Sequence, residues 1–284
     1  MTLFARFLDG PQGALFVVGR RPPDGPHPAH WVLVVPPLFE ELNRARRTLS
    51  LLGQALAAQG RGYLLPDLYG TGDSEGELSA TRWDTWLADL SRTHAWLLEQ
   101  GARRVDLLAL RGGALLCWEW LAATTTAVPL LRLWHPFTDG RQLVAQLLRL
   151  RLAGGLMGRG GRETTATLRA QLAQEGALEI GGYRLPAALI AQLEGIVLDA
   201  PGPRRIGAVD WYQVVAATGQ SLPAIAWQRA RDWQDAGIRT RLRAVEEAPF
   251  WATPEIVDGS RLIAATITDL IADLTAAAPD HGRD

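Results

Sequence analysis

Lysine is absent from this 284-residue chain, so all 29 basic side chains are arginines. Schiff-base chemistry and the phosphate loops of nucleotide-binding proteins both need a lysine, and the sequence therefore excludes both. The single cysteine, Cys117, excludes an internal disulfide and a cysteine-based metal cluster. Because Cys117 falls in an apolar helical stretch, we expect it to be a buried packing residue.

Long apolar runs and a strong charge imbalance are missing too. No run approaches the roughly 18 residues that a membrane-spanning helix needs, and residues 1–10 lack the basic-then-apolar order of a signal peptide. The net charge of −1 and the pI near 6.5 give no reason to expect a nucleic acid or an anionic membrane as partner. We expect a cytoplasmic protein without a transmembrane segment, a metal or a cofactor.

Short apolar strands alternate with amphipathic helices along the chain. This alternation predicts an α/β fold in which helices cover both faces of a mostly parallel sheet, opened by an antiparallel hairpin. The predicted strands are 3–10, 13–21, 30–37, 61–67, 105–108, 128–136, 222–228 and 238–245. The predicted helices are 43–59, 83–99, 114–121, 229–237 and 259–276.

Residues 139–204 have a different character. A helical stretch is broken by glycines at 154–161, and a short hairpin and a further helix follow. Such a block after a central strand predicts a cap or lid. We therefore expect the first part of the core at 1–138, the cap at 139–204, the second part of the core at 205–276 and a disordered tail at 277–284.

Residues 104–120, RVDLLALRGGALLCWEW, predict a strand, a sharp corner of small residues and a helix. Serine hydrolases hold their nucleophile in this layout, written small-x-Ser-x-small. The central position here is Arg111, which carries a permanent positive charge and cannot be a nucleophile. The oxyanion hole of such a site would use the N–H groups of Gly112 and of Leu38 or Phe39. Together with Arg111, these donors predict a site suited to a carboxylate or a phosphate.

The other members of a catalytic triad are also missing from their expected places. After the strand at 238–245 the chain reads EEAPFW, and the next histidine is His281. After the predicted strand at 222–228 the nearest acid is Asp232, which falls inside a helix. The sequence therefore does not predict an ordinary Ser-His-Asp mechanism.

Two interpretations of Arg111 stay open, and they are compatible. In the first, Arg111 forms a structural ion pair with Glu40 or Glu41, because a buried arginine without a carboxylate partner is costly. In the second, the site binds a ligand, and Glu40 or Glu41 is the general base, a role that the Arg111 charge opposes. His135 ends a strand on the same side of the sheet and is the only histidine placed to move a proton, unless it is structural.

Residues 67–76, DLYGTGDSEG, form a glycine-rich turn that we expect Asp67 and Asp73 to hold together. This segment resembles the Asp-x-x-Gly-x-Gly-x-Ser-x-Gly segment of α/β-hydrolases. With PPLFEELNRARR, ALRGGALL, LWHPFTDGRQLVAQLLRLR and APFW in order, most of residues 4–272 are similar to the exosortase A system-associated hydrolase 2 family. These bacterial proteins are encoded with extracellular-polysaccharide and exosortase genes. The resemblance implies the α/β-hydrolase fold with an inserted helical cap, and a hydrolase.

Two functions are consistent with these residues, besides a purely structural scaffold. The first is a hydrolase or acyl-transfer enzyme of exopolysaccharide metabolism, in which Arg111 and backbone N–H groups stabilise an oxyanion and Glu40, Glu41 or His135 activates water. The second is a catalytically inactive relative that binds an acyl or anionic ligand in the cap cleft, or pairs with a serine-bearing hydrolase. An acyl carrier protein is a further possible partner, because Arg44, Arg46 and Arg47 are either surface charges or contacts for an acidic group.

Overall fold

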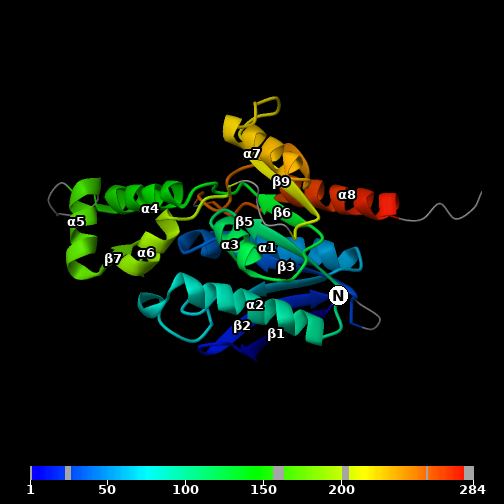
Figure 1. Ribbon diagram of the computed structural model, residues 1–284, viewed down its shortest axis with the longest axis horizontal. Helices are drawn as coiled ribbons and strands as arrows, with labels where there is room; N and C mark the ends of the chain where they lie inside the picture. Colours follow the sequence, from blue (N-terminus) through cyan, green and yellow to red (C-terminus); the bar gives the residue numbers. More distant parts are fainter. Residues whose placement is uncertain (1, 23–26, 156–162, 200–204, 254, 278–284) are drawn as a thin grey trace, which may run out of the picture.

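The computed structural model describes residues 2–22, 27–155, 163–199, 205–253 and 255–277. The strands of its main sheet are β1 (Thr2–Asp9), β2 (Ala14–Arg21), β3 (His30–Val35), β4 (Gly62–Pro66), β5 (Arg104–Leu110), β6 (Leu131–Trp134), β9 (Ala208–Val215) and β10 (Arg239–Glu246). Their order is β1-β2-β4-β3-β5-β6-β9-β10 (Figure 1). The β1–β2 and β2–β4 pairs are antiparallel and the other pairs are parallel. The predicted mostly parallel sheet with its opening hairpin is confirmed.

Helices cover both faces of this sheet, as predicted. The helices that pack on it are α1 (Glu40–Ala58), α2 (Trp83–Glu99), α3 (Gly113–Ala123), α7 (Ala224–Asp235) and α8 (Ser260–Ala277), and a short 3-10 helix, η1 (Leu78–Ala80), precedes α2. One face packs against α1 and α8, and the other packs against α2, α3 and α7 in a core rich in tryptophan. Cys117 of α3 is fully buried in that core, and burial raises the pKa of its thiol, so it is the packing residue that we expected.

The segment between β6 and β9 holds elements outside the main sheet. These are α4 (Gly140–Gly155), α5 (Thr165–Glu175), the antiparallel hairpin of β7 (Ala177–Ile180) and β8 (Tyr183–Pro186), and α6 (Ala187–Glu194). Figure 1 shows them projecting from one side of the sheet, in the segment where the sequence predicts a cap. Most of the glycine-rich break at 154–161, and the predicted tail apart from Ala277, lie outside the described residues.

One predicted strand is wrong. Residues 222–228 belong largely to α7, whose buried residues Ala226, Ala230 and Trp233 repeat at helical spacing. A short apolar run does not by itself distinguish a strand from a buried helical turn. The missed strand is β9, all eight residues of which are buried. Smaller differences are that α1 begins at Glu40, and that β6 covers only part of the strand predicted at 128–136.

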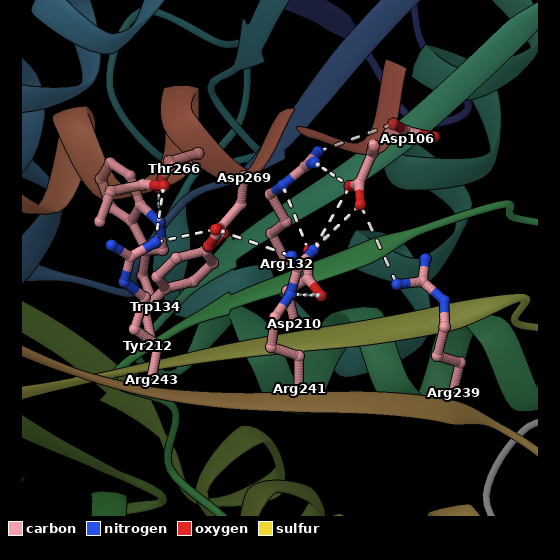
Figure 2. Close-up of polar contacts among 12 residues, drawn as sticks. Asp106, Arg132, Trp134, Asp210, Tyr212, Arg239, Arg241, Arg243, Thr266 and Asp269 are labelled. Carbon is pink, nitrogen blue, oxygen red and sulfur yellow. Dashed lines mark hydrogen bonds and ion pairs between the residues drawn. The ribbon is translucent and has the colours of Figure 1, made fainter. Parts of the chain in front are cut away.

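A row of buried charges explains why β9 escaped detection. Arg132 of β6, Asp210 of β9 and Arg241 of β10 are direct cross-strand neighbours. Arg132 is 1% exposed, and its guanidinium lies 3.3 Å from Asp273 of α8, 3.7 Å from Asp106 of β5 and 3.8 Å from Asp210 (Figure 2). Asp210, the single charged residue of β9, looks like a surface residue in the sequence. Here the opposite charges on neighbouring strands allow it to be buried.

Candidate functional site

Backbone strain gathers at the carboxyl edge of the sheet. Among the described residues, only three non-glycine residues have positive φ: Phe39 beyond β3 (59°), Arg111 after β5 (54°) and His135 after β6 (43°). Such conformations cost of order 1–3 kcal/mol each and gather at functional sites. The corner after β5 also needs a glycine two residues beyond Arg111, because a Cβ at Gly113 would lie 2.3 Å from the Pro36 carbonyl oxygen. The sharp strand–corner–helix turn predicted at 104–120 is therefore present.

The Arg111 side chain is buried and contacts Glu41, Gln146, His135 and Phe137. Its side chain is 7% exposed, and it donates to the Glu41 carboxylate from Nε (3.2 Å) and Nη2 (3.1 Å). Nη2 also donates to Oε1 of Gln146 (2.9 Å), and Nη1 lies 3.4 Å from the His135 carbonyl oxygen. The guanidinium stacks 4.0 Å from the centre of the Phe137 ring. The structural ion pair expected from the sequence is thus present, and its carboxylate is Glu41.

The two neighbouring glutamates have different surroundings. Oε1 of Glu41 accepts from Arg111 and from Nε2 of Gln146 (2.9 Å), whereas among the described residues Oε2 has only a 3.4 Å contact, with Arg111 Nε. Glu40 points elsewhere and accepts from Arg44, one helical turn away (3.1 Å). Of the two candidates for a general base, only Glu41 is therefore coupled to the elbow.

The His135 side chain lies between Gln213 of β9 and the ring of Trp251, and it is neutral. Burial, assisted by the Arg111 charge, lowers the pKa of His135 to about 4, although a hydrogen bond with the Val214 backbone opposes this. Oε1 of Gln213 accepts from the Trp211 indole (3.1 Å), which leaves its amide nitrogen, 3.1 Å from Nδ1, to donate to the imidazole. An imidazole that protonates only near pH 4 is a poor general base at neutral pH.

The places of a triad acid and base hold neither. The sequence places the triad acid after a strand at 222–228, where Asp232 is the nearest acid. In the structure the strand before β10 is β9, so the acid position is at residues 216–219, Ala-Ala-Thr-Gly. Asp232 lies within α7 and accepts from Arg229 (3.3 Å). Glu246, the last residue of β10, pairs with Arg261. Hydrogen bonds from Thr218 and Arg261 lower the pKa of Glu246 to about 2.

The predicted oxyanion donors lie together at the elbow. Within the described part of the chain, the N–H groups of Leu38, Phe39 and Gly112 donate no hydrogen bond. The side chains of Leu38 and Leu143 approach within 3.1 Å of where a Gly112 Cβ would lie. Three backbone N–H groups without an acceptor among the described residues are therefore present near the elbow, with leucine side chains packed against Gly112.

The glycine-rich turn depends on Asp67. Its buried carboxylate accepts from Arg46 (3.0 Å) and from the Asp73 backbone N–H (3.0 Å), and its carbonyl oxygen accepts from Ser74 (2.6 Å). Asp73 contributes through that backbone N–H, and its side chain is exposed. Asp67 also explains where Arg46 points. Arg44 and Arg47 pair with Glu40 and Asp258, so all three arginines of α1 are engaged in ion pairs.

A pocket of about 300 Å³ opens beside Glu41, between α1, α4 and residues 251–252. This volume lies at the lower end of the range for small-molecule sites. Its apolar wall consists of Leu38, Leu143, Leu147, Leu150 and Trp251. Glu41 and Gln146 supply polar groups, as do Glu40, Arg44 and Arg149, so the pocket has the amphipathic lining of a ligand site.

Three residues of the site, Gln146, Gln213 and Trp251, are not singled out by the sequence. Gln146 interrupts the apolar stripe of α4 between Leu143 and Leu147, and a polar residue on such a stripe indicates a buried hydrogen-bond partner. Gln213 lies on the strand that was not predicted. Trp251 covers both the His135 ring (5.0 Å between centres) and the Arg111 guanidinium (5.1 Å), and no local pattern announces this.

The mostly parallel sheet and the sharp corner at Arg111 are features of the α/β-hydrolase fold. The positions of the catalytic triad hold other residues. No family model matches the chain, and no curated protein matches it. Solved structures do. Est1E from Butyrivibrio proteoclasticus, solved with ferulic acid bound, gives a TM-score of 0.63 at 12% identity, over 96% of this chain and 100% of that one.

Two further solved structures are similar. Mouse alpha/beta hydrolase domain-containing protein 10 gives a TM-score of 0.56 at 17% identity, over 95% of this chain and 99% of that one. The thioesterase domain of the curacin biosynthetic pathway gives 0.56 at 16% identity, over 94% and 100%. The chain has the α/β-hydrolase fold. In the described residues no helix is long and apolar enough to cross a membrane, and no three potential ligands gather as a metal site.

Proposed function

We propose that this protein binds a ligand with an apolar, acyl-type chain in the pocket beside Glu41 and does not hydrolyse it by a Ser-His-Asp mechanism. The observation that carries the proposal is the elbow itself, where the nucleophile position is filled by a buried arginine that Glu41 and Gln146 engage. The residues that follow β9, at 216–219, include no acid, and those that follow β10, at 247–253, include no histidine. A scaffold that keeps its pocket and its strained corner but has no nucleophile is suited to binding.

The cellular setting is proposed from the sequence. The resemblance to the exosortase A system-associated hydrolase 2 family supports a cytoplasmic role in a bacterial exopolysaccharide system. An acyl carrier protein or a serine-bearing hydrolase of the same system would then be a partner. The ion pairs of Arg44, Arg46 and Arg47 do not favour these arginines as the contact for an acidic carrier.

Serine-free hydrolysis of an ester or thioester is the second candidate, because the Glu41 carboxylate lines the pocket. Glu41 would take a proton from water, which attacks the carbonyl carbon, and Arg111 with the Gly112 N–H would stabilise the oxyanion. Collapse of this intermediate would break the C–O or C–S bond, and the leaving alcohol or thiol would take the proton from Glu41. The geometry is less favourable to this route. Arg111 already donates to Glu41 and Gln146, and it would have to release them before it reached an oxyanion.

One experiment separates the two candidates. The purified protein is assayed against p-nitrophenyl esters and acyl thioesters, and binding of decyl compounds is measured by calorimetry and by the shift in melting temperature. We expect binding without turnover. Leu147→Trp, which fills the pocket, should abolish binding, whereas Leu98→Trp, at a 48% exposed position of α2, should not. Turnover that disappears in both Arg111→Ala and Glu41→Ala would replace our proposal with serine-free hydrolysis.

A further inference from the structure

We propose that the group of the ligand that reaches Glu41 is a neutral hydroxyl, which donates a hydrogen bond to Oε2. The pocket would then select an apolar chain bearing an alcohol over the same chain bearing a carboxylate or an ammonium group. This inference rests on the proposed ligand-binding function, since it specifies which ligand group contacts Glu41 in the same pocket.

The hydrogen bonds of Glu41 are unevenly shared between its two oxygens. Oε1 accepts at 3.2 and 3.1 Å from Arg111 and at 2.9 Å from Gln146. Within the described residues, Oε2 has a single contact of 3.4 Å, to Arg111 Nε. A carboxylate oxygen accepts about two hydrogen bonds, so Oε2 retains capacity for a donor. Glu41 is 12% exposed and lines the pocket, so a ligand inside it can supply that donor.

Charge disfavours an acidic group at Glu41, because a ligand carboxylate there would lie against a like charge. The Arg111 guanidinium is already engaged, since its Nε, Nη1 and Nη2 all have protein acceptors. Of the arginines that line the pocket, Arg44 donates to Glu40 and to backbone carbonyls, and Arg149 is exposed to solvent. Arg111 predicts an anion site in the sequence, but in the structure it is the acceptor Glu41 that lines the pocket.

Charge also disfavours an ammonium group. The two glutamates that line the pocket are already paired, Glu41 with Arg111 and Glu40 with Arg44, so a further cation would find no unpaired carboxylate there. A hydroxyl satisfies Oε2 without bringing a charge out of water, which is the smaller desolvation cost.

The test compares three ligands that share one chain: 1-decanol, decyl methyl ether and decanoate. Affinities for the wild-type protein are measured by calorimetry. A hydrogen bond to a charged group is worth about 1.5–3 kcal/mol, so we expect 1-decanol to bind at least about tenfold more tightly than the ether. Decanoate should bind more weakly than the alcohol. Equal affinity for alcohol and ether, or tighter binding of decanoate, would overturn the inference, whereas no binding of any decyl compound would overturn the proposed function.

Matched variants assign the effect to one carboxylate. Glu41→Gln, combined with Arg111→Met so that no buried arginine is left unpaired, should reduce the preference for alcohol over ether to less than about threefold. Glu40→Gln removes the same charge from the adjacent residue, which also lines the pocket, and should leave the preference unchanged. The reverse pattern would place the acceptor on Glu40 and contradict the inference. Because the ligand series needs only the wild-type protein, it decides the matter even where the double variant fails to fold.

Discussion

The Arg111–Glu41 ion pair predicts an asymmetry between two single substitutions. Glu41→Gln removes the charge partner of a guanidinium that is 7% exposed, whereas Arg111→Met removes the partner of a carboxylate that is 12% exposed and lines a pocket. Water in the pocket can solvate Glu41 after Arg111 is lost. The position of Arg111, between Phe137 and Trp251, gives its charge no such access.

The magnitudes follow from this difference. Removing one partner of a buried pair costs about 3–5 kcal/mol, and we expect Glu41→Gln to fall in that range. Arg111→Met should cost about 2 kcal/mol, because Glu41 is partly solvated and keeps its hydrogen bond from Gln146. The double variant should cost less than the sum of the two by about 2 kcal/mol, since replacing a whole buried pair is often nearly neutral.

Urea unfolding, followed by circular dichroism, measures the free energy of unfolding of the wild type and the three variants. Glu40→Gln is the control, because Glu40 pairs with Arg44 at the surface, and it should cost less than about 1 kcal/mol. Strict additivity of the two single substitutions would refute the coupling between Arg111 and Glu41. A larger loss for Arg111→Met than for Glu41→Gln would refute the argument from burial.

Three further predictions concern stability. Gly113→Ala places a Cβ 2.3 Å from a backbone carbonyl oxygen and should lower the free energy of unfolding by about 1–3 kcal/mol. Gly154→Ala is the control, because a Cβ there has no atom within 4 Å, and it should leave that free energy unchanged or raise it by up to about 1 kcal/mol. Urea unfolding measures both. Burial raises the pKa of Asp89 to about 6 from 3.8, so its favourable contribution to folding is complete below about pH 3.8 and is lost as the pH rises through 6. Asp89→Asn should therefore stabilise by up to about 3 kcal/mol at pH 8 and by almost nothing at pH 4; an equal gain at both pH values would contradict this. Arg132→Met should cost at least about 3 kcal/mol because it leaves buried aspartates short of a cation, and Arg239→Met, at a side chain that is 60% exposed, should cost under about 1 kcal/mol. Equal losses for the two would show that burial of the charged row adds nothing.

Local pattern was sufficient for most elements of the fold. The helix predicted at 83–99 coincides with α2, because its apolar residues repeat at helical spacing and the flanking residues do not. The corner at Arg111 was predictable as well, since a strand, small residues and an apolar helix leave few alternatives. The strand β9 was not, because Asp210 and Tyr212 look exposed until their partners, Arg241 of β10 and Asp269 of α8, are placed beside them.

The sequence by itself determined the α/β architecture, the loss of the serine nucleophile and the need of Arg111 for a carboxylate. These conclusions depend on residue types and on spacing within one segment. The tertiary structure alone decided which carboxylate that is, that Gln146 of α4 completes the pair, and that His135 stays uncharged at neutral pH. Each of these depends on side chains from segments far apart in the chain. Their distances and burial, which set hydrogen bonds and charge, exist only once the chain has folded.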